Sequence, residues 1–292
     1  MKDYIKQFFC EFDYEESDRE SLLKAYDRIV SNETAKNAFL ASLELYQNDV
    51  NFDFSKVVDN CGVMSDNTGV SIFASHLITF ISLTKHMQEI YAERGLPHEL
   101  YHNCMLDLKY KLEECKAVRG EVGVFVTNWF YGFYRLTRFA LGRLQFETVR
   151  FGRTYEKDGV KLDEESRVIN VHIPRTGTPI DKESCDEAYR LASEFFADKL
   201  EGPVVFVCSS WLLFPEVRDL INPKSNVYRF TSDYEILKVS YNTGGDLWRL
   251  FDTDEKHPDR LPADSSLRRA YIAHMKRGGR LGGAYGVYVY KK

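Results

Sequence analysis

The sequence predicts an α+β protein, with a helical N-terminal half packed on a C-terminal α/β half built around a mixed sheet. Before residue 140, apolar residues recur at helical spacing and strand signals are few. After residue 141, short β-branched runs alternate with helical segments. The length of 292 residues suits two domains. We therefore expect domains at 1–140 and 141–292, in close contact because no linker-like segment separates them.

The first half has the amphipathic pattern of a helical bundle. In the longest segment, Phe73, Leu77 and Phe80 fall on one stripe, and Gly95 and Pro97 follow it as stop signals. The predicted helices are 21–30, 34–46, 68–94, 99–118 and 121–141.

The second half alternates strands and helices. Strands are predicted at 143–149, 168–173, 204–208 and 284–290, with one or two more in 226–241, and helices at 181–200, 215–221 and 265–277. The strand–helix–strand order over 168–208 predicts a right-handed βαβ unit. The unbroken apolar run 204–208 is typical of a central strand that is buried on both faces.

Composition excludes several classes of protein. The net charge of −5 argues against general binding to nucleic acids or anionic membranes, although residues 265–292 contain seven basic residues and no acid. The most apolar stretch, 122–144, contains three arginines and predicts a buried helix rather than a membrane span. The six cysteines form no C-x-x-C pair, so no metal site is expected. With no signal-peptide pattern in 1–10, we expect reduced thiols in the cytoplasm.

The turn between the second predicted strand and its helix is a candidate phosphate site. Arg175, Thr176, Gly177 and Thr178 lead into a helix that Asp181 is expected to cap. Helix N-termini bind phosphates through free backbone N–H groups. An ordinary capped turn is the alternative, and P-loop and Rossmann glycine patterns are absent.

Three polar residues near strand ends are candidates for catalysis. His172 ends one strand and is either a general base or a hydrogen-bonded core residue, and Glu147 is open to the same two interpretations. Ser210 follows the predicted central strand, where ligands of open α/β sheets bind. No G-x-S-x-G elbow supports a nucleophilic serine.

Five separated motifs resemble one bacterial family of two-domain acyltransferases, which have a helical N-terminal domain and a GNAT-like C-terminal domain. The motifs are GRLQFE (142–147), HIPRTGTPID (172–181), CSSWLLFP (208–215), SNVYRF (225–230) and LRRAYIAHMKRGGR (267–280). The resemblance implies acyl-CoA as co-substrate and transfer of the acyl group to an amine of a small molecule or peptide.

The resemblance also implies roles for single residues. Val171 and Ile173 would line the pantetheine gap opposite 205–209, and the loop from Arg175 to Thr178 would bind the pyrophosphate. His172 or Glu147 would act as the base, with donors from Ser210 and its neighbour Ser209. The basic segment after residue 265 is open to two interpretations: a solvated basic face, or a segment whose Arg277 and Arg280 reach the phosphates of a CoA-like anion.

One departure from the family keeps a second function open. Relatives usually show [QR]-x-x-G-x-[GA] at the phosphate loop, whereas residues 175–179 contain one glycine. The alternative is a non-catalytic protein that binds a ligand or partner on a degenerate GNAT scaffold.

Overall fold

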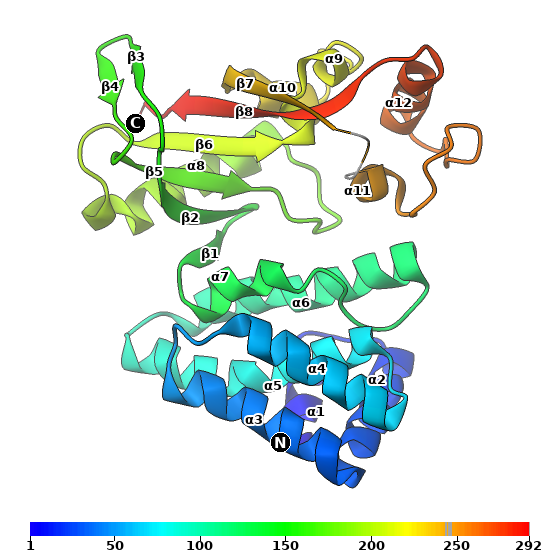
Figure 1. Ribbon diagram of the computed structural model, residues 1–292. Helices are drawn as coiled ribbons and strands as arrows, with labels where there is room; N and C mark the ends of the chain where they lie inside the picture. Colours follow the sequence, from blue (N-terminus) through cyan, green and yellow to red (C-terminus); the bar gives the residue numbers. More distant parts are fainter. Residues whose placement is uncertain (243, 245–246, 292) are drawn as a thin grey trace. The chain divides into compact units, whose positions relative to one another are not determined.

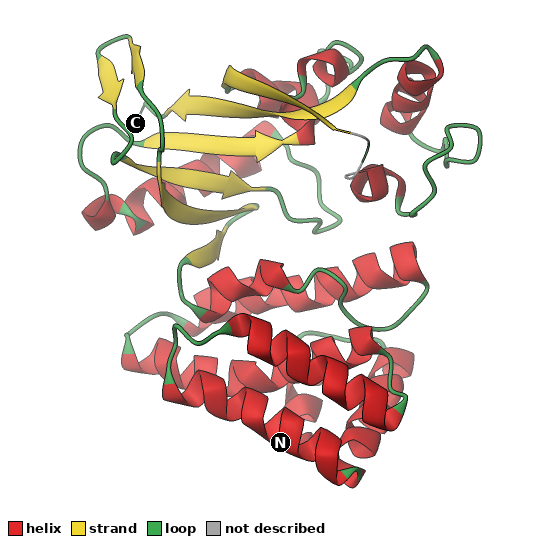
Figure 2. Ribbon diagram, viewed as in Figure 1, coloured by secondary structure: helices red, strands yellow, loops and turns green. Residues whose placement is uncertain are grey.

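The computed structural model describes residues 1–242, 244 and 247–291. Lys292, the last residue of the predicted basic tail, lies outside them. Contacts divide the chain into unit 1, Met1–Thr137, and unit 2, Arg138–Lys292. Unit 1 is helical and unit 2 is built on a mixed sheet, so the predicted fold class is confirmed for each unit (Figure 1, Figure 2).

Unit 1 is a helical bundle. Its elements are α1 (Lys2–Glu11), α2 (Glu16–Ser31), α3 (Glu33–Asn48), α4 (Phe54–Thr68), α5 (Ile72–Glu93), α6 (His98–Arg119), η1 (Asn128–Phe130) and α7 (Tyr131–Tyr134). Every residue of α5 from Ala74 to Thr84 is buried, which makes α5 the central helix of the bundle. None of the described helices is both long and apolar enough to cross a membrane.

Unit 2 has a six-stranded sheet in the order β1-β2-β5-β6-β8-β7 and a separate hairpin, β3–β4. The strands are β1 (Arg138–Leu141), β2 (Leu144–Arg150), β3 (Tyr155–Lys157), β4 (Val160–Leu162), β5 (Arg167–His172), β6 (Val205–Ser210), β7 (Glu235–Asn242) and β8 (Leu281–Val289). The helices are α8 (Lys182–Phe195), η2 (Ala197–Lys199), η3 (Trp211–Leu213), α9 (Pro215–Arg218), α10 (Asn226–Ser232), α11 (Leu247–Phe251) and α12 (Ser266–Lys276). Among the strand pairs of the described residues, only β5–β6 is parallel.

α8 covers one face of this sheet. Asp181 caps the helix by accepting a hydrogen bond from the backbone N–H of Ser184 at 2.9 Å, as predicted. The buried residues of α8 recur at helical spacing, and Tyr189 among them packs on Phe146 of β2 and Phe206 of β6. These contacts fix the orientation of the helix that follows the candidate phosphate loop (Figure 1).

Two predicted elements were wrong. Of the predicted helix over 121–141, only 128–134 is helical, as η1 and α7; residues 121–127 are irregular, and after α7 Leu136 adopts φ +54° and the chain enters β1. The predicted boundary at residue 140 thus falls inside β1. The segment 226–241, predicted as strand, begins with α10, whose start is capped by the Ser225 hydroxyl.

Candidate active site

β5 and β6 are parallel neighbours that pair over only part of their length. The last pair in their ladder joins Asn170 to Val207. On its other side, β5 pairs with β2 along its whole length, and β6 pairs with β8 in the same way. We call the unpaired stretch beyond Asn170 and Val207 the β5–β6 split. His172 and Ser209 lie on its two edges, each two residues past the last pair.

A polar network stands beside the β5–β6 split. Nε2 of His172 lies 2.6 Å from Oε1 of Glu147, and Arg138 donates from Nη2 to the same oxygen at 3.1 Å. Nδ2 of Asn170 lies 3.3 Å from that oxygen. The side chains of Glu147 and His172 are 17% and 18% exposed, so solvent screens this pair only weakly.

The protonation of Glu147 defines the tautomer of His172. Burial raises the pKa of the Glu147 carboxyl, but the hydrogen bond from His172 and the charge of Arg138 outweigh burial and lower the pKa to about 2. An ionised carboxylate only accepts hydrogen bonds, so Nε2 of His172 is the donor. In the neutral ring, Nδ1 then carries the lone pair.

Sheet register explains why these residues meet. Glu147 stands opposite Asn170 in the β2–β5 ladder, and residues opposite each other, or two apart on one strand, share a face. Glu147, Asn170 and His172 therefore share one face. Phe146 points to the other face, where its ring contacts Tyr189 of α8. The network lies on the face that α8 does not cover.

The loop before α8 is held by an arginine from the β1–β2 turn. The Arg143 guanidinium donates to the backbone carbonyls of Pro174, Thr178 and Pro179 at 3.1, 2.9 and 3.0 Å. Thr176 and Thr178 are linked through their hydroxyls at 2.6 Å. Since three carbonyls point to Arg143, the loop has a defined conformation at the N-terminus of α8.

Arg175 of this loop is held by an acid. Its guanidinium makes two contacts with the carboxylate of Asp252, which also accepts from Nη2 of Arg268 on α12 at 2.6 Å. The sequence interpretation placed Arg175 at the phosphates but gave no role to Asp252. A phosphate at this loop would therefore share Arg175 with that carboxylate.

The carboxyl end of β6 offers hydroxyl groups rather than a nucleophilic thiol. Ser209 is exposed, while the Ser210 hydroxyl accepts from the backbone N–H of Leu212 at 3.2 Å and caps η3. Burial raises the pKa of the Cys208 thiol to about 12, so the thiolate is not formed near neutral pH.

The two arginines after α12 have different surroundings. Arg280 forms an ion pair with Glu216 at 2.6 Å, and its guanidinium stacks over the Tyr241 ring at 4.2 Å. Arg277 is exposed and forms no ion pair within the described part of the chain. Of the two, Arg277 has the more accessible charge.

The residues proposed for the pantetheine gap are apolar. Val171 is buried on β5, and Ile173 directly follows the strand and is half-buried. Four residues were not singled out as functional from the sequence: Arg138, Asn170, Arg143 and Asp252. Arg143 stands in the quoted GRLQFE motif, which is the one signal that points to it.

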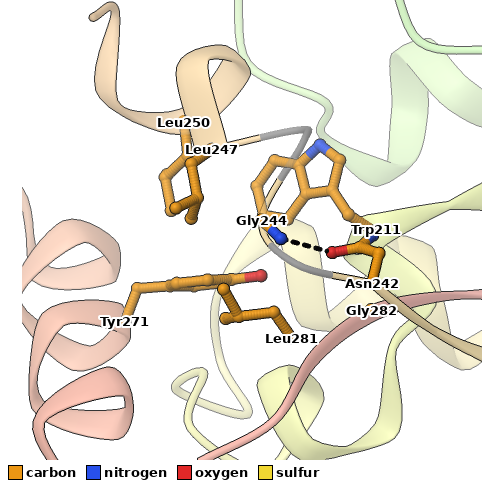
Figure 3. A pocket seen from close by; sticks show the side chains of 8 residues that line it. All are labelled: Trp211, Asn242, Gly244, Leu247, Leu250, Tyr271, Leu281 and Gly282. Carbon is orange, nitrogen blue, oxygen red and sulfur yellow. Dashed lines mark hydrogen bonds between the residues drawn. The ribbon is translucent and has the colours of Figure 1, made fainter. Parts of the chain in front are cut away.

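A small apolar pocket adjoins the end of β6. Figure 3 shows the rings of Trp211 and Tyr271 with Leu247, Leu250 and Leu281 around it. Its volume is about 10 Å³, the space of one water molecule. In this conformation it has no room for an acyl chain. No cluster of metal-ligating side chains occurs among residues 1–242, 244 and 247–291.

Comparison with solved structures shows the same fold. An acyltransferase in complex with decanoyl-CoA and teicoplanin is 21% identical, with a TM-score of 0.74 over 98% of this chain and 87% of that one. A mutant acyltransferase in complex with octanoyl-CoA is 20% identical, with a TM-score of 0.75 over 99% of this chain and 88% of that one. No curated protein matches the chain.

Two family models together span nearly the whole sequence. Residues 3–136 match the N-acyltransferase N-terminal domain, and residues 138–288 match the GNAT-like C-terminal domain. The junction between the two matches coincides with the division between unit 1 and unit 2. The chain belongs to the family of the GNAT-like C-terminal domain, joined here to an N-acyltransferase N-terminal domain.

Proposed function

We propose that this protein is an acyl-CoA-dependent acyltransferase that moves an acyl group to an amine of a small molecule or peptide. The observation that carries the proposal is the β5–β6 split with the His172–Glu147 pair on its edge. The solved acyltransferases of the same fold are complexes with decanoyl-CoA, octanoyl-CoA or CoA, which supports acyl-CoA as the donor.

The donor would lie along the β5–β6 split and the loop before α8. The pantetheine arm fits between Val171–Ile173 and 205–209, because strands that do not pair leave backbone groups for a ligand. The pyrophosphate fits at 175–178, where the N-terminus of α8 favours negative charge. Arg143 keeps that loop in place.

Transfer of the acyl group from the thioester to an amine needs a base that takes a proton from the amine nitrogen. The amine nitrogen attacks the thioester carbonyl carbon, the C–S bond breaks, and CoA leaves as the thiolate. His172 Nδ1 takes the proton that the nitrogen loses, while Glu147 holds Nε2–H and stabilises the imidazolium. The proton then neutralises the thiolate. Ser209 and Ser210, on the other edge of the β5–β6 split, are the proposed donors to the thioester oxygen.

The proposed acceptor belongs to the class of peptide-like amines. Two of the solved acyltransferases are complexes with teicoplanin or 10C-teicoplanin, which supports a peptide-like acceptor for this chain. The second candidate function, a non-catalytic binding protein, is favoured by the pairing of Arg175 with Asp252.

A measurement of acyl-CoA binding distinguishes an acyltransferase from a non-catalytic binding protein. The thermal midpoint of the full chain is measured with acetyl-CoA, octanoyl-CoA, decanoyl-CoA and CoA. A ligand at about 100 times its Kd adds about 2.7 kcal/mol to the free energy of unfolding, which raises the thermal midpoint by several degrees. Such a rise, with thiol release that requires an added amine, supports the acyltransferase. The absence of any rise would exclude it.

A further inference from the structure

A polar pocket lies on the same face of the sheet as the His172 network. Its volume is about 350 Å³, and its lining includes Ser209, Ser240, Asn242, Tyr285 and two cations, Arg153 and Lys238. No acidic side chain is among the described residues that line it. We call it the cationic pocket.

Strand register places the cationic pocket at the β5–β6 split. Ser209, which lines the pocket, stands opposite Tyr285 on β8, and Tyr285 stands opposite Lys238 on β7. Val207, two residues before Ser209, stands beside Asn170, so these side chains share the face that carries His172. A molecule in the pocket thus borders the edge of the β5–β6 split where the thioester would be attacked.

The two cations of the pocket have no acidic partner in the described part of the chain. Neither Arg153 nor Lys238 forms an ion pair within the described residues, whereas Arg138, Arg175 and Arg268 of the same unit each pair with a carboxylate. Arg153 stacks over the Tyr285 ring, with its guanidinium carbon 4.0 Å from the ring centroid. Its Nε is buried and has no hydrogen-bond partner among the described residues. A buried charged donor without a partner is costly, and a bound anion would remove that cost.

We propose that the cationic pocket recognises a carboxylate of the acceptor, so that the substrate is an amine that also carries an acidic group. This inference rests on the proposed acyl transfer and specifies its acceptor. Arg153 binds carboxylates in a planar, two-point geometry, and its stacking on Tyr285 restricts its rotation before the ligand arrives. The hydroxyl of Ser240, which also lines the cationic pocket, supplies a further hydrogen bond.

The test uses dipeptides with a free C-terminal carboxylate and the same dipeptides as C-terminal amides. Both sets have the same amine and differ in one charge. Binding to the full chain is followed by saturation-transfer difference NMR without acyl-CoA. The proposal expects signals for the carboxylates, weak or no signals for the amides, and loss of the carboxylate signals in Arg153→Gln and Lys238→Met.

Arg150→Gln is the matched control. Arg150 lies on β2 and pairs with exposed Glu165 at 3.0 Å, away from the pocket lining. This variant removes the same charge and should keep the carboxylate signals. Equal signals for carboxylates and amides, no signal for either set, or unchanged signals in Arg153→Gln would overturn the proposal.

Steady-state kinetics with carboxylate and amide acceptors tests this inference independently of the proposed function. With acyl-CoA present, Arg153→Gln should raise KM for a carboxylate acceptor by about ten-fold or more and leave KM for its amide unchanged. Acyl-CoA binding should remain in Arg153→Gln. A chain that binds carboxylates but no acyl-CoA would contradict the proposed function alone, and a chain that transfers equally to both sets would contradict the inference alone.

Discussion

Nε2 of His172 donates to Oε1 of Glu147 at 2.6 Å, across the ladder between two neighbouring strands. The sequence interpretation treated these residues as alternative bases. Their geometry supports unequal roles, because a carboxylate with a pKa of about 2 is a weak base at neutral pH. Glu147 is therefore expected to orient His172, which leaves His172 as the proposed base.

Substitution of the pair should lower turnover and leave donor binding intact. His172→Ala removes the proposed base, and we expect kcat to fall by about 10²- to 10⁴-fold with an unchanged Kd for acyl-CoA. Glu147→Gln keeps the shape but no longer enforces Nε2–H, so kcat should fall while the pH profile changes. Steady-state kinetics with titration calorimetry checks both. Full turnover of His172→Ala would exclude His172 as the base.

The Glu147 carboxyl should also contribute to stability in a defined pH range. Its pKa falls from 4.5 to about 2 on folding. A lowered pKa stabilises the fold above pH 4.5, and this contribution is lost as the pH falls toward 2. The lowering of this pKa corresponds to about 3 kcal/mol of the free energy of unfolding.

Urea unfolding checks this contribution. Above about pH 5, the free energy of unfolding of the wild type should exceed that of Glu147→Gln by a constant amount, and the difference should shrink at lower pH. A difference that does not change between pH 6 and pH 3 would contradict the assignment.

Arg143 should matter for donor binding more than for folding. Arg143→Ala removes three hydrogen bonds to the carbonyls of the phosphate loop, so we expect acyl-CoA affinity to fall by about ten-fold or more. Arg190→Ala is the control, since Arg190 is exposed on α8 and its guanidinium pairs only with Glu187 and Glu194 among the described residues. Equal affinities of the two variants would show that the loop conformation is unimportant.

The two arginines after α12 should respond differently to charge reversal. Arg277→Glu should weaken CoA binding and keep the free energy of unfolding within about 0.5 kcal/mol, because the side chain is exposed. Arg280→Glu places an acid beside Glu216 and should destabilise the fold. Calorimetric CoA titration and urea unfolding measure the two effects. Unchanged CoA binding in Arg277→Glu would remove this residue from the donor site.

The sequence predicted the local features of the site and missed the long-range ones. β5, α8 and β6 were predicted because apolar runs and the Asp181 cap are local signals. α4 was missed because it contains Gly62 and several polar residues with low helix propensity. The contacts of Arg143 and Asp252 join segments far apart in the chain, which no periodicity encodes.

Hydrogen–deuterium exchange with decanoyl-CoA tests the central claim most directly. If the donor lies in the β5–β6 split, the backbone amides of 171–178 and 207–210 should become protected on binding, while those of the β3–β4 hairpin, which contributes no residue to the proposed donor site, should not change. The same pattern should appear with CoA over 175–178. Binding without protection of these segments, or no binding at concentrations up to about 1 mM, would contradict the account.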